Sequence, residues 1–303
     1  MKNACLFILS LFLLDPALSF GQERGIREAK FVRLGGIEQW ITIESEDRNN
    51  PVILFLHGGP GSTMTPYEDV MYGKWTKEFT LVKWDQRGAG RTYGRNAPEG
   101  AGEDYWIDNP LTVAQMTADG IELSEYLVKT LGKRKIILVG TSWGSVLGAR
   151  MALTRPDLFL AYVGHSQIVN AAEGFQAAYT TVNRLAREAG DPESLEKLAA
   201  LGPPPYGDAR KDGQLMRIIK KYERLRSTPA PESWWKLAPE YDNEKDERDR
   251  ANGDDYSFLH YAGHQKMGVR PMSGGINFMD DGLNFKVPVY LSRASSTSLH
   301  RRN

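Results

Sequence analysis

The residues best placed to do chemistry form a glycine-flanked serine segment, Gly-Thr-Ser-Trp-Gly at 140–144. It follows an apolar run at 135–139 and precedes a stretch that predicts a helix over 143–154. In this setting the serine sits at a strained strand-to-helix apex, where its hydroxyl is exposed above the sheet. The pattern predicts Ser142 as a nucleophile and offers the free N–H groups of the helix N-terminus, including that of Trp143, to an anion. The alternative is a glycine–serine turn without chemistry.

A second glycine-rich segment, His-Gly-Gly-Pro-Gly at 57–61, ends another apolar run at 51–56. Such a turn lets a backbone N–H point at the serine and complete an oxyanion hole, where each donor is worth ~3 kcal/mol of transition-state stabilisation. We expect His57 to support this turn through hydrogen bonds rather than to act as a base. Asp85 and Arg87 follow the next strand and are expected to form an ion pair that braces the loops.

The elements that must position these residues alternate between strands and helices. Gly35-Gly36 separates two alternating runs and predicts a hairpin. Continuous apolar runs predict strands covered on both faces, and the Thr112-x-x-Gln115 pattern predicts a capped helix that ends at Gly132. The expected strands are 31–34, 37–43, 51–56, 79–84, 135–139, 159–165 and 287–291. This alternation predicts an α/β fold with a mostly parallel sheet.

The pattern changes after residue 165. Residues 166–282 contain charged, helical segments without a clear buried strand, and the strand pattern returns only at 287–291. An insertion of this length between two sheet strands predicts a helical cap over the active site. The expected organisation is a signal peptide at 1–21, the first part of the core at 22–165, the cap at 166–282, and a last core strand with an aberrant tail at 283–303.

Three motifs in this order, HGGPG at 57–61, DQRGxG at 85–90 and GTSWGS at 140–145, resemble the proline iminopeptidase group of the α/β-hydrolase superfamily. The resemblance implies Ser142 as nucleophile, Gly59 and Trp143 as oxyanion N–H donors, and no metal or organic cofactor. It also implies acidic cap residues that hold a substrate amino group, with Glu173 and Glu232 as candidates. Thr141 departs from the family pattern, which usually has Gly there, and 163–168 lacks its usual L-R-G-I-F stretch.

A serine hydrolase also needs a base and an acid that orients it, and the superfamily order is Ser, then Asp or Glu, then His. Residues 292–303 contain no Asp, Glu or Gly, and His300 lies too close to the last strand for the usual role. We therefore expect that the chain from about 292 is a frameshifted or otherwise aberrant terminus without the last strand and helix. On this expectation the chain as given is unstable or nearly inactive.

Other acids and histidines are weaker candidates because of their place in the order. His260 and His264 precede the final strand and are expected to belong to the cap. Their i, i+4 spacing is also typical of a metal site, but the sequence offers no third ligand to support one. Asp280 and Asp281 precede the same strand. His165 ends a strand near the nucleophile, where the family places no base.

Composition excludes several other classes. Apolar residues make up 41% and charged residues 25%, and 38 basic residues balance 38 acidic ones, so nothing favours nucleic-acid binding. The one cysteine excludes a disulfide scaffold. A lysine, an apolar run at 4–14 and the small-x-small pattern at 17–19 predict a secretory signal peptide too short to span a membrane, and hence a secreted or periplasmic protein.

The sequence thus predicts a secreted serine hydrolase that acts on a small peptide or ester substrate. An esterase or lactonase on the same scaffold and a non-catalytic binding protein are the alternatives. Haloalkane dehalogenase and epoxide hydrolase chemistry is excluded, because both need Asp at the position that Ser142 occupies.

Overall fold

The computed structural model describes residues 25–67, 70–281 and 283–292. The predicted signal peptide at 1–21 and the tail from 293, with His300, lie outside the described residues and stay predictions. The strands are β1 (Ile26–Leu34), β2 (Ile37–Ser45), β3 (Val52–Leu56), β4 (Thr80–Trp84), β5 (Ile136–Thr141), β6 (Phe159–His165) and β7 (Val289–Ser292). The α-helices are α1 (Gly90–Asn96), α2 (Glu103–Asp108), α3 (Val113–Thr130), α4 (Trp143–Thr154), α5 (Ala171–Glu188), α6 (Pro192–Leu201), α7 (Ala209–Arg224), α8 (Glu244–Ala262) and α9 (Phe278–Asp281). Short 3-10 helices are η1 (Gly73–Lys77), η2 (Pro156–Leu158), η3 (Glu232–Trp235), η4 (Pro239–Tyr241), η5 (Gln265–Met267) and η6 (Met272–Gly275).

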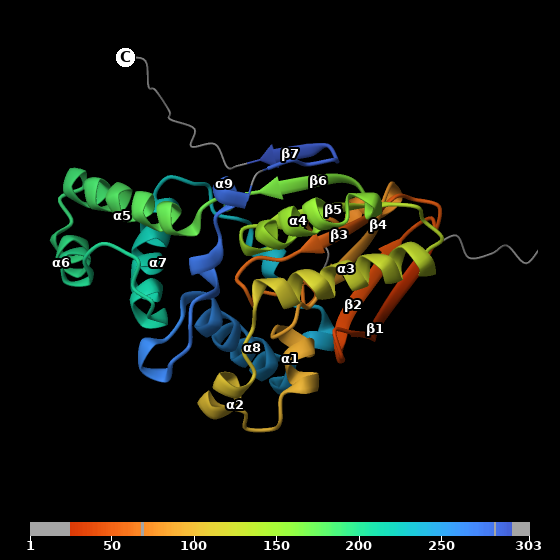
Figure 1. Ribbon diagram of the computed structural model, residues 1–303, viewed down its shortest axis with the longest axis horizontal. Coiled ribbons are helices and arrows are strands. Elements are labelled where there is room, and N and C mark those ends of the chain that lie inside the picture. Colours follow the sequence, from red (N-terminus) through yellow and green to blue (C-terminus); the bar gives the residue numbers. More distant parts are fainter. Residues whose placement is uncertain (1–24, 68–69, 282, 293–303) are drawn as a thin grey trace, which may run out of the picture.

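The strands form one twisted seven-stranded sheet in the order β1-β2-β4-β3-β5-β6-β7 (Figure 1). The hairpin of β1 and β2 is antiparallel, and β2 pairs antiparallel with β4, whereas every pair from β4 to β7 is parallel. The prediction of a mostly parallel α/β sheet is therefore confirmed. In the parallel part all strands end at the same edge, and that edge collects the loops that carry the predicted motifs.

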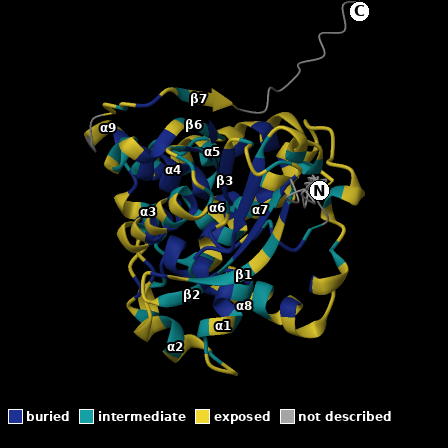
Figure 2. Cartoon of the chain, turned by 90° about the vertical axis from the view of Figure 1, so that its right-hand side faces the viewer, coloured by how far each residue is buried: buried dark blue, intermediate teal, exposed yellow. Residues whose placement is uncertain are grey.

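Helices α3 and α4 cover one face of the sheet (Figure 1). Helix α3 begins as its sequence predicts, because the Thr112 hydroxyl accepts a hydrogen bond from the backbone N–H of Gln115 at 3.1 Å. Its stripe of Met116, Leu123 and Leu127 is fully buried against the core. The central strands form the buried centre of the molecule, while the outer edge at β7 is exposed (Figure 2).

Residues between β6 and β7 are helical, with two kinds of packing. Helices α5, α6 and α7 enclose a small hydrophobic core of their own, which is built from Val182, Leu185, Ala186, Leu198, Leu215, Ile218 and Tyr222. Helix α8 instead joins the main core through Tyr256 and Tyr261. It lies directly on the loop after β4, where the Ser257 hydroxyl donates a hydrogen bond to the carbonyl of Gly88 at 2.7 Å.

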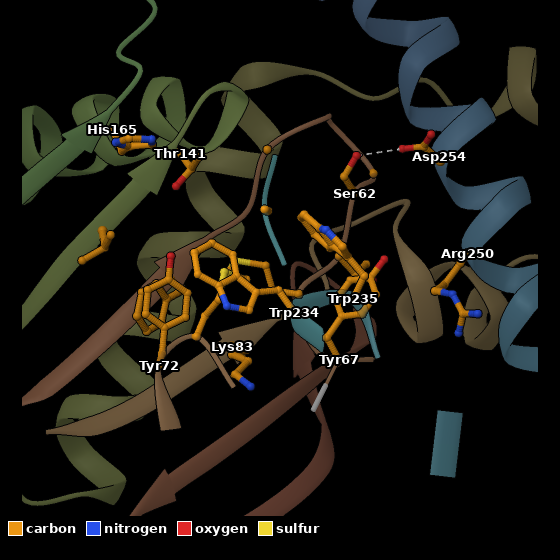
Figure 3. Close-up of a pocket in the computed structure, with 18 of the residues that line it drawn as sticks. Ser62, Tyr67, Tyr72, Lys83, Thr141, His165, Trp234, Trp235, Arg250 and Asp254 are labelled. Atoms are coloured by element: carbon orange, nitrogen blue, oxygen red, sulfur yellow. Dashed lines mark hydrogen bonds between the residues drawn. The ribbon is translucent and has the colours of Figure 1, made fainter. Parts of the chain in front are cut away.

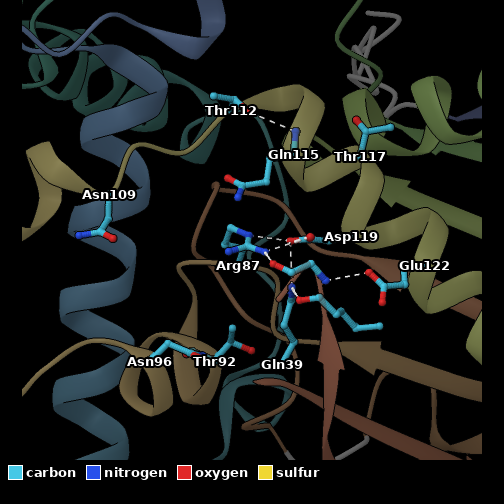
Figure 4. A network of polar contacts seen from close by, with 12 residues as sticks. Gln39, Arg87, Thr92, Asn96, Asn109, Thr112, Gln115, Thr117, Asp119 and Glu122 are labelled. Atoms are coloured by element: carbon cyan, nitrogen blue, oxygen red, sulfur yellow. Dashed lines mark hydrogen bonds and ion pairs between the residues drawn. The ribbon is translucent and has the colours of Figure 1, made fainter. Parts of the chain in front are cut away.

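A buried polar network corrects one prediction about the loop after β4 (Figure 4). The predicted ion pair between Asp85 and Arg87 does not form; Arg87 pairs with Asp119 of α3, with 2.7 Å between Nε and Oδ2. Arg87 also donates to the carbonyl of Gly35, and Gln39 donates to Asp119 at 2.9 Å. The network ties the β1–β2 turn, β2 and α3 to the loop. Proximity in the sequence did not predict the partner of Arg87, because the side chains of Asp85 and Arg87 leave the loop in different directions.

We predict that Asp119→Ala lowers the free energy of unfolding by about 3 kcal/mol or more, because it leaves the guanidinium of Arg87 without its buried partner. The matched control is Glu125→Ala, which removes an exposed partner of Arg155 and should change stability little. Urea unfolding followed by circular dichroism measures both. Equal effects of the two substitutions would contradict a structural role for the network.

Candidate active site

Ser142 occupies the turn between β5 and α4 with φ +51° and ψ −117°. A positive φ is strained for a residue with a Cβ and typically costs ~1–3 kcal/mol, so the surrounding structure must impose it. Three hydrogen bonds do so. The Ser142 N–H donates to the carbonyl of His165 at 3.0 Å, and the Ser142 carbonyl accepts from the N–H of Ser145 at 2.9 Å and from its hydroxyl at 2.5 Å. The serine is half-buried at the edge where the parallel strands end. The sequence predicted this strained apex.

The two glycines of the motif allow the chain to pass at close range. A Cβ on Gly144 would lie 1.9 Å from the carbonyl oxygen of Leu56, at the end of β3. A Cβ on Gly140 would lie 2.4 Å from the carbonyl oxygen of Gly144. Both contacts involve backbone atoms, so no side-chain adjustment relieves them. Helix α4 can therefore begin tightly against the neighbouring strand only with glycine at these positions.

The glycine-rich loop after β3 lies beside the serine. A Cβ on Gly58 would be 3.3 Å from Cβ and 3.9 Å from Oγ of Ser142. Gly59 turns the chain with φ +105°, and a Cβ there would meet the backbone nitrogens of Gly61 and Ser62 at 2.7 Å. The role of the Gly59 N–H as an oxyanion donor stays a prediction, as does that of the Trp143 N–H in the first turn of α4, where backbone N–H groups have no intrahelical acceptor.

His57 is a buried support of this loop. Its Nδ1 lies 2.8 Å from the carbonyl oxygen of Gly58, and its Nε2 accepts a hydrogen bond from the backbone N–H of Gln86. Burial lowers the pKa of His57 to about 4, so the ring is neutral at physiological pH. The side chain of Gln86 donates to the carbonyl of His57 and accepts from Trp143 Nε1 at 3.1 Å. Gln86 thus joins all three motif segments.

Asp85, at the end of β4, is also fully buried. It accepts hydrogen bonds from the Thr65 hydroxyl at 2.5 Å and from the backbone N–H of Arg91 at 2.9 Å. Burial is the larger effect and raises the pKa of this carboxyl to about 7. The Arg91 side chain continues to the cap, where it pairs with Asp246 of α8 at 2.7 Å and stacks on Tyr241. The carboxylate therefore belongs to the joint between core and cap.

A cleft of about 940 Å³ extends from Gly58 and the ends of β5 and β6 across the face of the sheet opposite α3 and α4. Its floor includes Phe55 and Val139, and cap residues from η3 and α8 form the far wall (Figure 3). At that wall the Ser62 hydroxyl donates to Asp254 of α8 at 3.1 Å. Gly58 and Thr141, the neighbours of Ser142, line the cleft, whereas Ser142 itself is not among its lining residues.

The structure places the remaining candidates in different environments. His165 lies at the cleft, with its Nδ1 3.0 Å from the Ser292 hydroxyl. His260 is buried in α8, where its Nε2 lies 2.9 Å from the carbonyl oxygen of Trp106. His264 begins η5. Asp280, in α9, accepts a hydrogen bond from the Asn277 amide.

The cap acids differ from the expected ones. Glu173 and Glu232 do not line the cleft, whereas Glu247 and Asp254 do. The sequence offered no way to choose among the acids of α8, because the choice depends on which face of the helix turns inward. The sequence does carry a signal for the same wall: the adjacent pair Trp234-Trp235 stands in an otherwise polar stretch, and both residues line the cleft.

Within the described residues (25–67, 70–281 and 283–292), no three His, Cys, Asp or Glu side chains lie close enough together to hold a metal ion. None of the helices in that part of the chain is long and apolar enough to cross a membrane.

Comparison with known sequences gives a family match and several named relatives. A family model described as the alpha/beta hydrolase fold matches residues 51–207, just over half of the chain. The chain is 32% identical over 189 residues to the probable aminopeptidase YbaC of Bacillus subtilis, a match that covers 61% of this chain and 55% of that protein. It is 37% identical over 183 residues to a probable proline iminopeptidase of Streptomyces coelicolor, with 58% and 47% covered. The chain spans about half the length of these relatives.

Solved structures agree on the fold. A proline iminopeptidase from Mycobacterium smegmatis superposes with a TM-score of 0.58 at 16% identity, covering 87% of this chain and 80% of that one. The structure of VinJ gives a TM-score of 0.59 at 22% identity with the same coverage. At these identities the likeness concerns the fold alone.

We predict that Gly144→Ala prevents stable folding, because the new Cβ would collide with the carbonyl of Leu56. The matched control is Gly174→Ala in α5, where a Cβ would meet nothing within 4 Å and alanine's helix propensity should raise stability by up to ~1 kcal/mol. Soluble yield and thermal unfolding measure the difference. A Gly144→Ala variant that unfolds like the parent would show that the tight turn is not required.

We predict that Asp85 makes the protein less stable as pH rises from about 4 to 7. Within this range the folded state keeps a proton that the unfolded state, with the ordinary pKa of 3.8, has released. Asp85→Asn does not ionise, so its stability relative to the parent should increase between pH 4 and pH 8, by a few kcal/mol at most, since one pKa unit corresponds to ~1.4 kcal/mol. Urea unfolding at several pH values measures this, with the exposed Asp104→Asn as control. A relative stability that is constant with pH would contradict the prediction.

Proposed function

Because the chain belongs to the alpha/beta hydrolase fold family, we propose that it is a serine hydrolase of the proline iminopeptidase type, with Ser142 as its nucleophile. The observation that carries this proposal is the backbone of Ser142, a non-glycine residue held at φ +51° between a buried strand and a helix. Strain of this kind persists where the surrounding structure imposes it, and it clusters at active sites. The names of the relatives support amide hydrolysis as the reaction.

The proposed chemistry begins with attack of Ser142 Oγ on a substrate carbonyl that enters through the cleft. Negative charge then develops on the carbonyl oxygen. The N–H of Trp143 at the start of α4 and the N–H of Gly59 in the neighbouring loop are the proposed donors to that oxygen. Gln86 supports both segments, since it bonds to the loop through the His57 carbonyl and to the indole of Trp143. This positions the donors before the reaction starts.

The proton of the serine hydroxyl needs a base. Among the hydrogen bonds of the described residues, none joins Ser142 Oγ to a histidine, and the histidine at the cleft, His165, contacts Ser292 rather than a carboxylate. We therefore propose that residues 1–303 by themselves turn over substrate slowly. A hydrolase without its full triad keeps ~10³–10⁴-fold catalysis over water from its oxyanion hole and substrate binding.

Aminopeptidase specificity is the finer part of the proposal. A free substrate amine is an ammonium group, and an acid in the cleft wall is the partner it requires. Asp254 and Glu247 of α8 lie in that wall and are the proposed partners, in place of Glu173 and Glu232. Hydrolysis of an ester or lactone on the same scaffold needs no such acid, so these two residues discriminate between the two classes.

We predict that a fluorophosphonate probe labels the protein slowly at Ser142, as expected of a serine without an adjacent base, and that Ser142→Ala abolishes labelling. Ser227→Ala, an exposed serine at the end of α7, is the matched control and should label like the parent. Intact-protein mass spectrometry measures the adduct. Labelling of Ser142→Ala equal to that of the parent would overturn the assignment of the nucleophile. Efficient hydrolysis of a prolyl arylamide that is lost in Ser142→Ala would instead show that a base is present.

A further inference from the structure

Helix α8 lies directly on the loops that carry the predicted motifs. The positions that contact α1 and the loop before it are spaced three and four residues apart, as one side of a helix requires: Asp246, Asp249, Gly253 and Ser257. A Cβ on Gly253 would lie 3.0 Å from the carbonyl oxygen of Gly88. The helix therefore touches the core through its backbone as well as through its side chains.

The loop after β3 makes a similar contact at Gly61. Its φ is +102°, and a Cβ there would lie 2.7 Å from Cα and 3.0 Å from Oδ1 of Asp254. Because Cα is a backbone atom, rotation of the Asp254 side chain would not relieve this contact. The backbone of the loop thus rests on the backbone of α8 at this residue.

A hydrogen bond fastens the loop to the same residue of α8. The hydroxyl of Ser62 donates to Oδ1 of Asp254 at 3.1 Å (Figure 3). Both residues are exposed, so this bond adds little to the stability of the whole protein. Its effect is local, because residues 58–62 contain no strand or α-helix and depend on such contacts for their position.

Ser62 lies next to the proposed oxyanion donor. The chain turns back at Gly59, where φ is +105° and a Cβ would lie 2.7 Å from the backbone nitrogen and 3.1 Å from Oγ of Ser62. One residue earlier, a Cβ on Gly58 would lie 3.3 Å from Cβ of Ser142. This short loop therefore joins the nucleophile at one end to Asp254 at the other.

We infer that Asp254 and Ser62 are positioning residues for the oxyanion hole: through their hydrogen bond, α8 fixes the loop so that the N–H of Gly59 meets the carbonyl oxygen attacked by Ser142. The inference rests on the proposed function for the role of that N–H. Preorganised donors stabilise developing charge without rearrangement, and a misplacement of ~1 Å can cost ~10²-fold in rate. Asp254 thus has a role in addition to its proposed contact with a substrate ammonium group.

The test is the rate at which a fluorophosphonate labels Ser142, because the phosphonyl oxygen takes the place of the substrate carbonyl oxygen. A bond forms between Ser142 Oγ and phosphorus, fluoride leaves, and the hydroxyl proton passes to solvent. Ser62→Ala and Asp254→Ala should each lower this rate about tenfold. The double variant should be no slower than either, since all three lose the same bond. The probe carries no ammonium group, so a lost amine contact cannot explain the result.

Conservative variants and a neighbouring acid complete the test. Ser62→Thr keeps the hydroxyl and Asp254→Asn keeps an oxygen that accepts its hydrogen bond, so both should label near the rate of the parent. Asp255→Ala removes an exposed acid from the next position of α8 and is the matched control, which should label like the parent. Thermal unfolding shows that each variant is folded. Labelling rates that Ser62→Ala and Asp254→Ala leave unchanged, or effects of the two that add, would overturn the inference.

Hydrogen exchange of the backbone amides at 58–62, followed by mass spectrometry, separates this outcome from that of the proposed function. Ser62→Ala and Asp254→Ala should both speed exchange there. Faster exchange without any labelling of Ser142 would support the hold of α8 on the loop and reject the proposed function. Labelling of Ser142 at a rate that both substitutions leave unchanged would support the nucleophile and reject the positioning residues.

Discussion

The arrangement of the active site depends on one close approach, that of helix α4 to the end of β3. The backbone of Gly144 passes so near the carbonyl of Leu56 that no Cβ fits between them. This approach fixes where α4 begins, and the sharp turn from β5 that precedes it forces Ser142 to φ +51°. The strain at the serine is thus balanced by the packing of α4 on the sheet, where Val146, Leu147 and Met151 are fully buried. A weakly packed helix would let the turn relax and the hydroxyl withdraw.

A second set of contacts holds the loops and the cap around that turn. Gln86 connects the loop after β3 to Trp143, and the pair of Arg91 and Asp246 connects the loop after β4 to α8. These groups are buried or partly buried, so their hydrogen bonds are costly to leave unmade and they specify one arrangement of the loops. His57 and Asp85, which the sequence predicts as supports of the loops, serve this purpose. Burial favours the neutral form of both side chains.

The cap and the sheet together make a site that neither contains alone. The sheet contributes the serine and an apolar floor, and the cap contributes two tryptophans, a balanced set of charges and the wall that closes the cleft. The hydrolase assignment follows from the family match. The chain spans about half the length of the named relatives.

The sequence by itself determined the sheet, the position of the serine and the order of the motif loops. Buried parallel strands are continuous apolar runs, and tight turns need glycine, so local composition carries this information: the strand at 159–165 and the helix at 143–154 appear as predicted. Only the tertiary structure decided that Arg87 pairs with Asp119, that Gly58 is the loop residue against Ser142, and that Asp254 rather than Glu173 faces the cleft. These choices depend on which faces of distant helices and loops meet, and the direction in which a side chain leaves a loop is set by packing between segments far apart in the chain rather than by its sequence neighbours.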